Sequence, residues 1–205
     1  MLRQPLDGGA ITILLENPPE TPLFAAASHP DGRLVYSSGR LPEVEIRLLS
    51  PDGSVEVLVE AARQMATDLS PDGRWLVFHS DRSGQFELYA LDLDAEGARP
   101  RQITSEGALF GSFAPDGRSL YLRSRTYPGP AEILRAPFDP TTGLLGELES
   151  VMTTAAQGYT SSWWQLGLFE VTEDGLILAQ LRAPPRTGRI VLVRNWALEI
   201  AERLR

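Results

Sequence analysis

The side chains of a hydrolytic triad occur next to one another at His79, Ser80 and Asp81. A serine nucleophile needs an imidazole within hydrogen-bonding distance and a carboxylate that orients this imidazole. The apolar residues before His79 are typical of a strand. Adjacent side chains of a strand point to opposite faces, so these three residues cannot form a relay with one another. We therefore expect a strand end and a loop in which Ser80 and Asp81 accept backbone hydrogen bonds.

Metal binding is the second chemistry to consider. Residues 92–97 (Asp-Leu-Asp-Ala-Glu-Gly) match the first half of a calcium-binding loop, but Ile103 stands where such a loop has a bidentate glutamate. An acidic hairpin turn is therefore the favoured interpretation. With no cysteine and only two histidines, His29 and His79, a thiolate or histidine metal centre is not expected. The sequence also lacks a phosphate-binding loop and a nucleophile elbow, and we predict neither a cofactor nor a catalytic site.

The composition limits the partners. The chain has 205 residues, of which 42% are hydrophobic, enough to bury one sizeable core. There are 19 Lys and Arg against 27 Asp and Glu, and the net charge of −8 disfavours binding to nucleic acid or to an anionic membrane. We find no signal-peptide pattern and no apolar stretch long enough to span a bilayer. The segment as given is expected in the cytoplasm, or outside it if a membrane-anchored parent carries it.

One motif occurs three times and decides the expected fold. Asp31, Asp72 and Asp116 each lie in a Pro-Asp-Gly-Arg turn before a short apolar run, and they are 41 and 44 residues apart. This spacing matches the period of four-stranded propeller blades. A weaker copy around Asp174, 58 residues further on, lacks the proline and the arginine. The sequence thus predicts an all-β fold, a β-propeller of about four blades with four antiparallel strands each: three clear blades, one degenerate blade and a partial N-terminal blade.

Strand patterns set the expected blade boundaries. A second Pro-Asp-Gly sequence, at 51–53, joins two alternating strands and is interpreted as a C–D turn rather than as another repeat. In the best copy the four strands A to D are expected at 65–69, 75–78, 86–91 and 101–104. We predict a single domain, 1–205, made of a partial blade (1–17), three blades (23–60, 64–104 and 108–152), a degenerate blade (162–196) and a short helical tail (197–205).

Both ends of the chain lie within a blade. Residues 2–6 and 11–15 fit strands C and D of a blade without strands A and B, and residues 188–194 fit a strand C without a strand D. The N-terminal strands could therefore close a small ring, or the chain could be an arc of a larger propeller. We favour the open arc, whose unpaired edge strands could self-associate.

The best repeat resembles a known family. Its Ser-Pro-Asp-Gly-Arg sequence at 70–74, its Ser-Asp-Arg-Ser-Gly loop at 80–84 and its Glu-Leu-Tyr strand at 87–89 resemble the TolB-type propeller repeat, a WD-repeat-like blade. The resemblance covers residues from about 23 to about 152, with other residues in the loop at 38–40 and 124–126. The C-terminal part is similar to the propellers of bacterial receptor-type serine/threonine kinases. That resemblance implies a sensory or interaction domain whose catalytic partner lies upstream.

Blade geometry predicts where binding occurs. The A–B and C–D turns of a propeller share one face, and the B–C loops and D–A connections share the other. Guanidinium groups and aromatic rings on the second face suit recognition of a protein or a carboxylate, although the arginines could instead pair with carboxylates of adjacent blades. The pair Trp163 and Trp164 is expected to pack within or between blades, with a place on a binding surface as the alternative. The candidate binding residues on the B–C face are Arg40, Asp81, Arg82, Arg125, Tyr127 and Tyr159.

These patterns favour a non-enzymatic propeller module that binds a protein or a small molecule on the B–C face or in the central channel. The module would be a sensory or interaction part of a larger bacterial protein. Two alternatives stay open: the propeller portion of a serine peptidase-type hydrolase whose catalytic domain is not in this sequence, and a structural arc that self-associates. Neither nucleic acid nor a membrane is expected to contact this segment.

Overall fold

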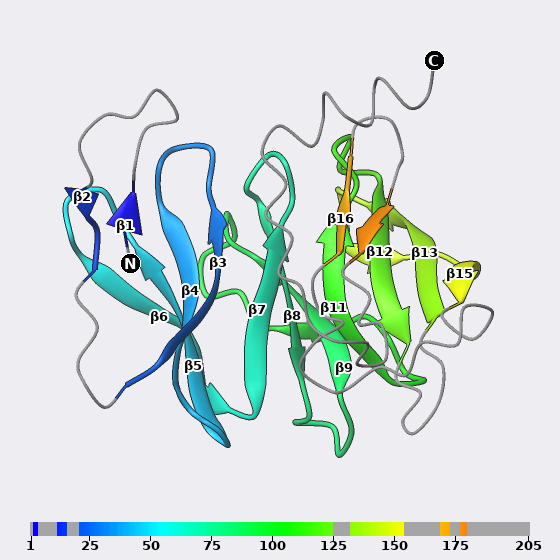
Figure 1. Ribbon diagram of the computed structural model, residues 1–205, viewed down its shortest axis with the longest axis horizontal. Helices are drawn as coiled ribbons and strands as arrows, with labels where there is room; N and C mark the ends of the chain where they lie inside the picture. Colours follow the sequence, from blue (N-terminus) through cyan, green and yellow to red (C-terminus); the bar gives the residue numbers. More distant parts are fainter. Residues whose placement is uncertain are drawn as a thin grey trace, which may run out of the picture.

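The computed structural model describes residues 2–3, 12–15, 21–124, 132–153, 169–172 and 177–179. Every regular element in these ranges is a β-strand, and all strand pairs are antiparallel. Three larger sheets follow one another along the chain and stand side by side, from blue through green to yellow in Figure 1. The predicted all-β propeller architecture is thereby confirmed.

The first two sheets each contain four strands in chain order, as the repeat predicts. In each sheet the Pro-Asp-Gly turn joins the first two strands, and the aspartate side chain accepts the backbone N–H two residues further on. The 51–53 turn joins the third and fourth strands of the first sheet, so its interpretation as a C–D turn is confirmed. The strands are β3 (Leu23–Ser28), β4 (Leu34–Arg40), β5 (Glu43–Leu49) and β6 (Val55–Ala62), then β7 (Gln64–Leu69), β8 (Trp75–Ser80), β9 (Glu87–Asp92) and β10 (Arg101–Gln102).

The third sheet differs from the expected pattern at its outer edge. The single outer strand expected of a four-stranded blade is replaced by two short strands, which both pair with β13. Pro137 of β13 explains the break, because proline has no N–H to donate to a ladder. Between the two short strands, the N–H of Gly146 donates to the Pro137 carbonyl. The strands are β11 (Ala108–Phe113), β12 (Ser119–Ser124), β13 (Glu132–Asp139), β14 (Leu144–Leu145) and β15 (Glu149–Thr153).

Two short β-hairpins lie at the two ends of the series of three larger sheets. The hairpin of β1 (Leu2–Arg3) and β2 (Thr12–Ile13) lies beside the first sheet in Figure 1. The hairpin of β16 (Phe169–Val171) and β17 (Ile177–Ala179) lies beside the third sheet and is the A–B pair expected of the degenerate repeat. The described residues thus form an open arc. The strand predicted at 188–194 and the helical tail predicted at 197–205 lie outside them.

The core lies between the sheets, and β8 belongs to both halves of it. All six residues of β8 are buried. Leu76 and Phe78 pack into the cluster that fills the space toward the first sheet, and Trp75 and Val77 pack into the cluster toward the third sheet. The central sheet is therefore covered on both faces, which accounts for the unbroken apolar run of this strand.

Hydrogen bonds also join neighbouring sheets. The first strands of successive sheets, β3, β7, β11 and β16, contact one another along the inner side of the arc. The Ser37 hydroxyl accepts the N–H of Ala66 at 2.8 Å, and the Asp68 carboxylate accepts the N–H of Phe113 at 2.8 Å. Both N–H groups belong to the inner edge strands of their sheets, so side chains of the preceding sheet satisfy donors that have no ladder partner on that side.

The turn end of the arc is fastened around Trp75. Its indole N–H donates to the Pro140 carbonyl at 2.8 Å, and Arg101 donates to the Thr142 carbonyl. Gly143, in the same turn, has a φ of +65°, and a Cβ there would stand 2.4 Å from the Trp75 ring. The close approach of this turn to the second sheet therefore requires glycine.

We predict that Gly143→Ala is more destabilising than Gly97→Ala. Gly97 also lies in a C–D turn, has a nearly equal φ of +67°, and has no atom within 4 Å of the position of an added Cβ. Both changes cost about 1–2 kcal/mol because of the left-handed backbone. Gly143→Ala should cost about 1–3 kcal/mol more, because the methyl group overlaps the Trp75 ring. The free energies of unfolding in urea measure this difference, and equal values would contradict the packing described.

Candidate binding site

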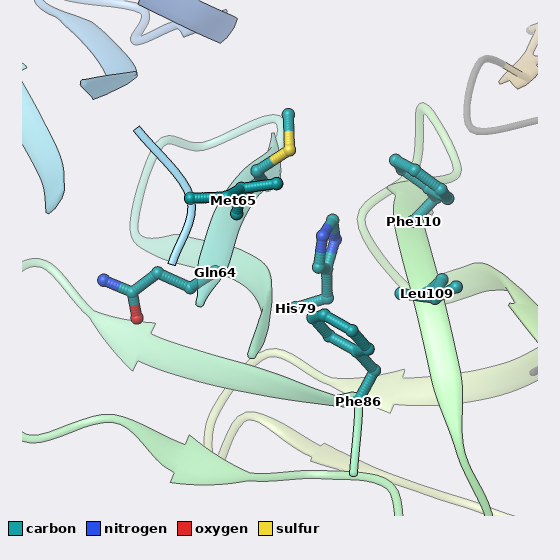
Figure 2. A pocket seen from close by; sticks show the side chains of 7 residues that line it. Gln64, Met65, His79, Phe86, Leu109 and Phe110 are labelled. Atoms are coloured by element: carbon teal, nitrogen blue, oxygen red, sulfur yellow. The ribbon is translucent and has the colours of Figure 1, made fainter. Parts of the chain in front are cut away.

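A cavity of about 30 Å³ lies at the end of the arc opposite the Pro-Asp-Gly turns. Its walls come from the β4–β5 turn, the start of β7, the end of β8, the residue before β9 and the start of β11. The B–C loops and the D–A connections thus meet at one end, where blade geometry places them. The lining residues are Leu41, Gln64, Met65, His79, Phe86, Leu109 and Phe110 (Figure 2).

His79 is the central polar residue of the cavity. Its side chain is only 5% exposed, and its ring makes edge contacts with the rings of Phe86 at 5.6 Å and Phe110 at 5.0 Å. Figure 2 shows the imidazole standing between Met65 and Phe110, above Phe86. Burial lowers the pKa of His79 to about 4, so the ring is neutral at physiological pH. Its Nδ1 atom has no hydrogen-bond partner within the described part of the chain.

The backbone at Phe110 is strained. Phe110 has a φ of +49°, a conformation that costs energy for any residue with a Cβ, and a β-bulge interrupts the pairing of β11 with β12 at this residue. The next residue must be small, since a Cβ on Gly111 would stand 2.9 Å from Val77. The bulge and this close approach together direct the Phe110 ring to the edge of the cavity.

A buried carboxylate positions the connection from the second sheet to the third. Glu87 is fully buried and accepts hydrogen bonds from the N–H of Gly107 at 2.8 Å and from the Thr104 hydroxyl at 2.5 Å. The Thr104 hydroxyl in turn accepts the N–H of Leu88. Sequence analysis missed this role of Glu87. The sequence signal for it is that Glu87, Tyr89 and Leu91 alternate along β9 and therefore lie on one face of the strand, where a carboxylate among apolar side chains needs hydrogen-bond donors.

Arg82, a predicted binding residue, braces the joint between the first two sheets. Its guanidinium donates to the Gln64 side-chain oxygen at 2.5 Å and lies over the rings of Phe78 and Tyr89, at 5.3 Å and 5.1 Å. The Gln64 amide donates to the Val44 carbonyl of the first sheet at 2.9 Å. Burial lowers the pKa of Arg82. Arg82 thus contacts an amide of its own sheet, which in turn reaches the first sheet, and not the carboxylate of an adjacent blade that the alternative hypothesis expected.

The other predicted binding residues fall in three places. Asp81 follows β8, and its carboxylate lies 3.6 Å from the guanidinium of Arg63, which itself lies over the Phe86 ring at 5.2 Å. Arg40 is exposed at the end of β4, next to Leu41 of the cavity. The structure therefore brings Asp81 and Arg82 near the cavity. The remaining predicted residues, Arg125, Tyr127 and Tyr159, and the pair Trp163 and Trp164, lie outside the described residues.

The candidate catalytic and metal motifs have structural contacts. The Ser80 hydroxyl accepts N–H groups of Arg82, as expected for a loop anchor. Asp92, the first residue of the calcium-like loop, pairs with Arg74 at 2.8 Å, and this hydrogen bond lowers the pKa of Asp92. Among the described residues, no three metal-binding side chains form a cluster. The same residues contain no helix that is long and apolar enough to cross a membrane.

Comparison with known proteins supports the fold. No protein-family model matches the chain. An uncharacterized protein of Agrobacterium fabrum is 28% identical over 116 residues, which are 55% of this chain and 39% of that protein. The solved structure of a candidate TolB from Agrobacterium tumefaciens matches 87% of this chain and 64% of its own, with a TM-score of 0.67 and 22% identity. TolB from Acinetobacter baumannii matches 74% of this chain and 37% of its own, with a TM-score of 0.60 and 20% identity.

The chain therefore has the β-propeller fold seen in TolB-type proteins, and it spans less than two thirds of the length of each of these relatives. Because the two TolB structures are only 22% and 20% identical to the chain in sequence, their similarity to it shows a shared fold and nothing more. The similarity to kinase-associated propellers stays a prediction.

We predict that His79 makes stability depend on pH between about 6.5 and 4. The unfolded chain binds a proton to this histidine near pH 6.5, whereas the folded chain does so only near pH 4. Stability is therefore fully retained above pH 6.5 and falls as the pH decreases, by roughly 3 kcal/mol in total. Urea unfolding of the native chain and of His79→Leu across this range measures the effect. The native chain should lose more stability than the variant, and parallel curves would contradict the burial of a neutral imidazole.

We also predict that Arg82→Ala lowers stability by about 1–3 kcal/mol, because the buried Gln64 oxygen loses its donor and two aromatic rings lose their cation. Arg118→Ala is the control, since Arg118 is exposed in a turn, and this change should stay within about 0.5 kcal/mol. Thermal and urea unfolding compare the two. If Arg82→Ala is as mild as the control, Arg82 is available for a partner.

Proposed function

We propose that this chain is a non-enzymatic propeller module that binds a protein or a small ligand at the end formed by the B–C loops and D–A connections, with the cavity at His79 as the anchoring point. The observation that carries the proposal is an aromatic, apolar cavity lined by the buried imidazole of His79. Ligand sites in proteins commonly combine apolar walls with a few polar atoms that set orientation.

The walls and the rim of the cavity support this role. Met65 and Phe86 offer the adaptable sulfur and the flat ring that are frequent at recognition surfaces. At the rim, Leu41 is 38% exposed, although large apolar side chains are usually covered. Arg40, the last residue of β4, and Arg63, between β6 and β7, adjoin the lining residues Leu41 and Gln64 in the sequence.

The rigid sheets of the propeller also support a binding role. Loops on rigid sheets commonly carry binding residues, because the sheets hold the loops at fixed positions. A propeller fold alone does not determine an activity, so the proposal depends on the cavity and not on the likeness to TolB. As part of the same proposal, the chain is a sensory or interaction part of a larger bacterial protein.

The test is selection of peptides from a randomised display library on the purified chain, followed by affinity measurement with the selected peptides. We predict that Leu41→Ser weakens binding about tenfold, as loss of an apolar contact at the centre of an interface does. Leu144→Ser is the matched control, because Leu144 is 47% exposed on the outer strand β14 and should not contribute. Failure to select any peptide, or an equal effect of both changes, would argue against this site.

Two further measurements separate the alternatives. Esterase, lactonase and peptidase assays on the native chain and on His79→Leu test for a catalytic role, and turnover that His79→Leu abolishes would overturn the non-enzymatic proposal. Light scattering over a concentration series tests for self-association through the outer strands, which carry exposed Val55, Val57 and Val151. Loss of peptide binding on self-association would place the peptide and the partner copy on the same surface.

A further inference from the structure

We infer that the outer edge of β6 is a second binding site, at which an extended, basic segment of a partner protein adds an antiparallel strand to the first sheet. The site does not depend on the proposed role of the cavity, because β6 begins directly after the 51–53 turn and the cavity lies at the opposite end of the arc. Three features of β6 support the inference: the direction of its backbone groups, its exposed valines and its charge.

Val55 and Val57 direct their backbone N–H and C=O groups away from the sheet. The N–H of Ser50 donates to the carbonyl of Ser54 at 2.9 Å, so the backbone groups of Ser54 face β5. Along an antiparallel strand these groups alternate in direction from residue to residue, and the register of β6 with β5 is regular up to Val57. No strand of the described residues pairs with the outer side of β6. The outward groups are therefore open to the addition of a strand.

Other outer edges of the arc are closed to such pairing. After Val57 the register of β6 shifts twice, which marks β-bulges, and the carbonyl of Glu60 accepts the Gln64 amide at 2.7 Å. The outer strands β10 and β14 have two residues each. Bulges, covered groups and short strands are the means by which proteins prevent unwanted pairing at sheet edges. Residues 54–57 have none of these, and they also lack the lysine or proline that often protects an edge.

The side chains at the start of β6 offer a different chemistry on each face of the sheet. Val55 and Val57 are 43% and 40% exposed on one face. Glu56 is exposed on the other face, where it lies opposite Leu48 of β5. Side chains that lie opposite each other on paired strands share a face and interact. A segment that suits this edge therefore has apolar residues in alternation with residues that complement a carboxylate.

The charge of the edge selects a basic occupant. Residues 51–62 contain three acidic residues, Asp52, Glu56 and Glu60, and no basic residue. All three are exposed, and neither glutamate has an ion pair within the described part of the chain. Arg63, the first cation after β6, already pairs with Asp81. Opposite charges across a strand pair stabilise it, so lysine or arginine opposite Glu56 favours binding.

The same charge argues against a second copy of this chain as the occupant. If two copies paired in antiparallel fashion through the outward groups of Val55 and Val57, each Val55 would face Val57 of the other copy. The two Glu56 side chains would then lie directly opposite each other, which is destabilising. Two chains that each carry a net charge of −8 also repel one another.

The first test uses a synthetic peptide of alternating lysine and valine, with a peptide of alternating glutamate and valine as the matched control. We predict that the lysine peptide binds the native chain saturably and that the glutamate peptide binds about tenfold more weakly or not at all. Valines opposite Val55 and Val57 would donate to β6, so N-methylation of the valine amides should weaken binding about tenfold, whereas N-methylation of the lysine amides should not. Fluorescence anisotropy of labelled peptides measures these affinities.

Two variants locate the site on the chain. Val57→Pro removes one outward N–H at a position where an edge strand tolerates proline, and it should weaken binding of the lysine peptide about tenfold. Glu56→Lys should weaken it about threefold to tenfold and should strengthen binding of the glutamate peptide. Glu147→Lys is the matched control, because Glu147 is exposed at the outer edge of the third sheet and undergoes the same change of charge. Leu41→Ser, at the cavity, should also leave this binding unchanged.

Equal affinity for the two peptides, or an equal effect of N-methylation at valine and at lysine, would overturn the inference. The same holds if Glu56→Lys has no greater effect than Glu147→Lys. A dimer in light scattering that Val57→Pro abolishes would assign the edge to a second copy and would likewise overturn it. If Val57→Pro does not fold, Glu56→Lys and the N-methylated peptides decide the question. Because Leu41→Ser tests the cavity and Glu56→Lys tests the edge, failure of either proposal is recognised separately.

Discussion

Burial of β8 on both faces is the constraint on which the described structure depends. Leu76 and Phe78 fill one core and Trp75 and Val77 fill the other, so the central sheet has no solvent-facing side. Each such side chain contributes about 1.5–3 kcal/mol through burial. Loss of either neighbouring sheet would expose one of the two sets, and each sheet is therefore stable mainly through its neighbours, as in other repeat proteins.

This apolar arrangement makes every polar group between the sheets costly unless it has a partner. Gln64, Asp68 and Glu87 meet that requirement by satisfying backbone groups or a cation across a gap that the ladders do not bridge. They hold the sheets in register at the inner side of the arc. The Nδ1 atom of His79 differs from them, since it is buried in the same region and lacks a partner among the described residues.

The cavity results from the way in which the second and third sheets meet. Gly111 lets β11 approach Val77, and the bulge at Phe110 absorbs the extra residue. His79 stands between Phe110 and Met65, and these three side chains line the cavity. The guanidinium of Arg82 lies in the joint between the first two sheets, so the surface that we propose for binding is more apolar than a ring of guanidinium groups would be.

Local chemistry in the sequence was enough to determine the blades. In the repeated turns, the side chains of Asp31, Asp72 and Asp116 accept the backbone N–H two residues further on, and along the strands side chains alternate with a two-residue period. Both features can be recognised from the sequence without knowledge of the fold. Only the tertiary structure decided the roles of Arg82, Glu87 and His79. Gln64, the acceptor for Arg82, lies 18 residues away along the chain, and Thr104 and Gly107, the donors to Glu87, lie 17 and 20 residues away. The surroundings of His79 include Phe110, which lies on another sheet. Periodicity is a property of one segment, whereas burial and hydrogen-bond partners arise only when separate segments pack together.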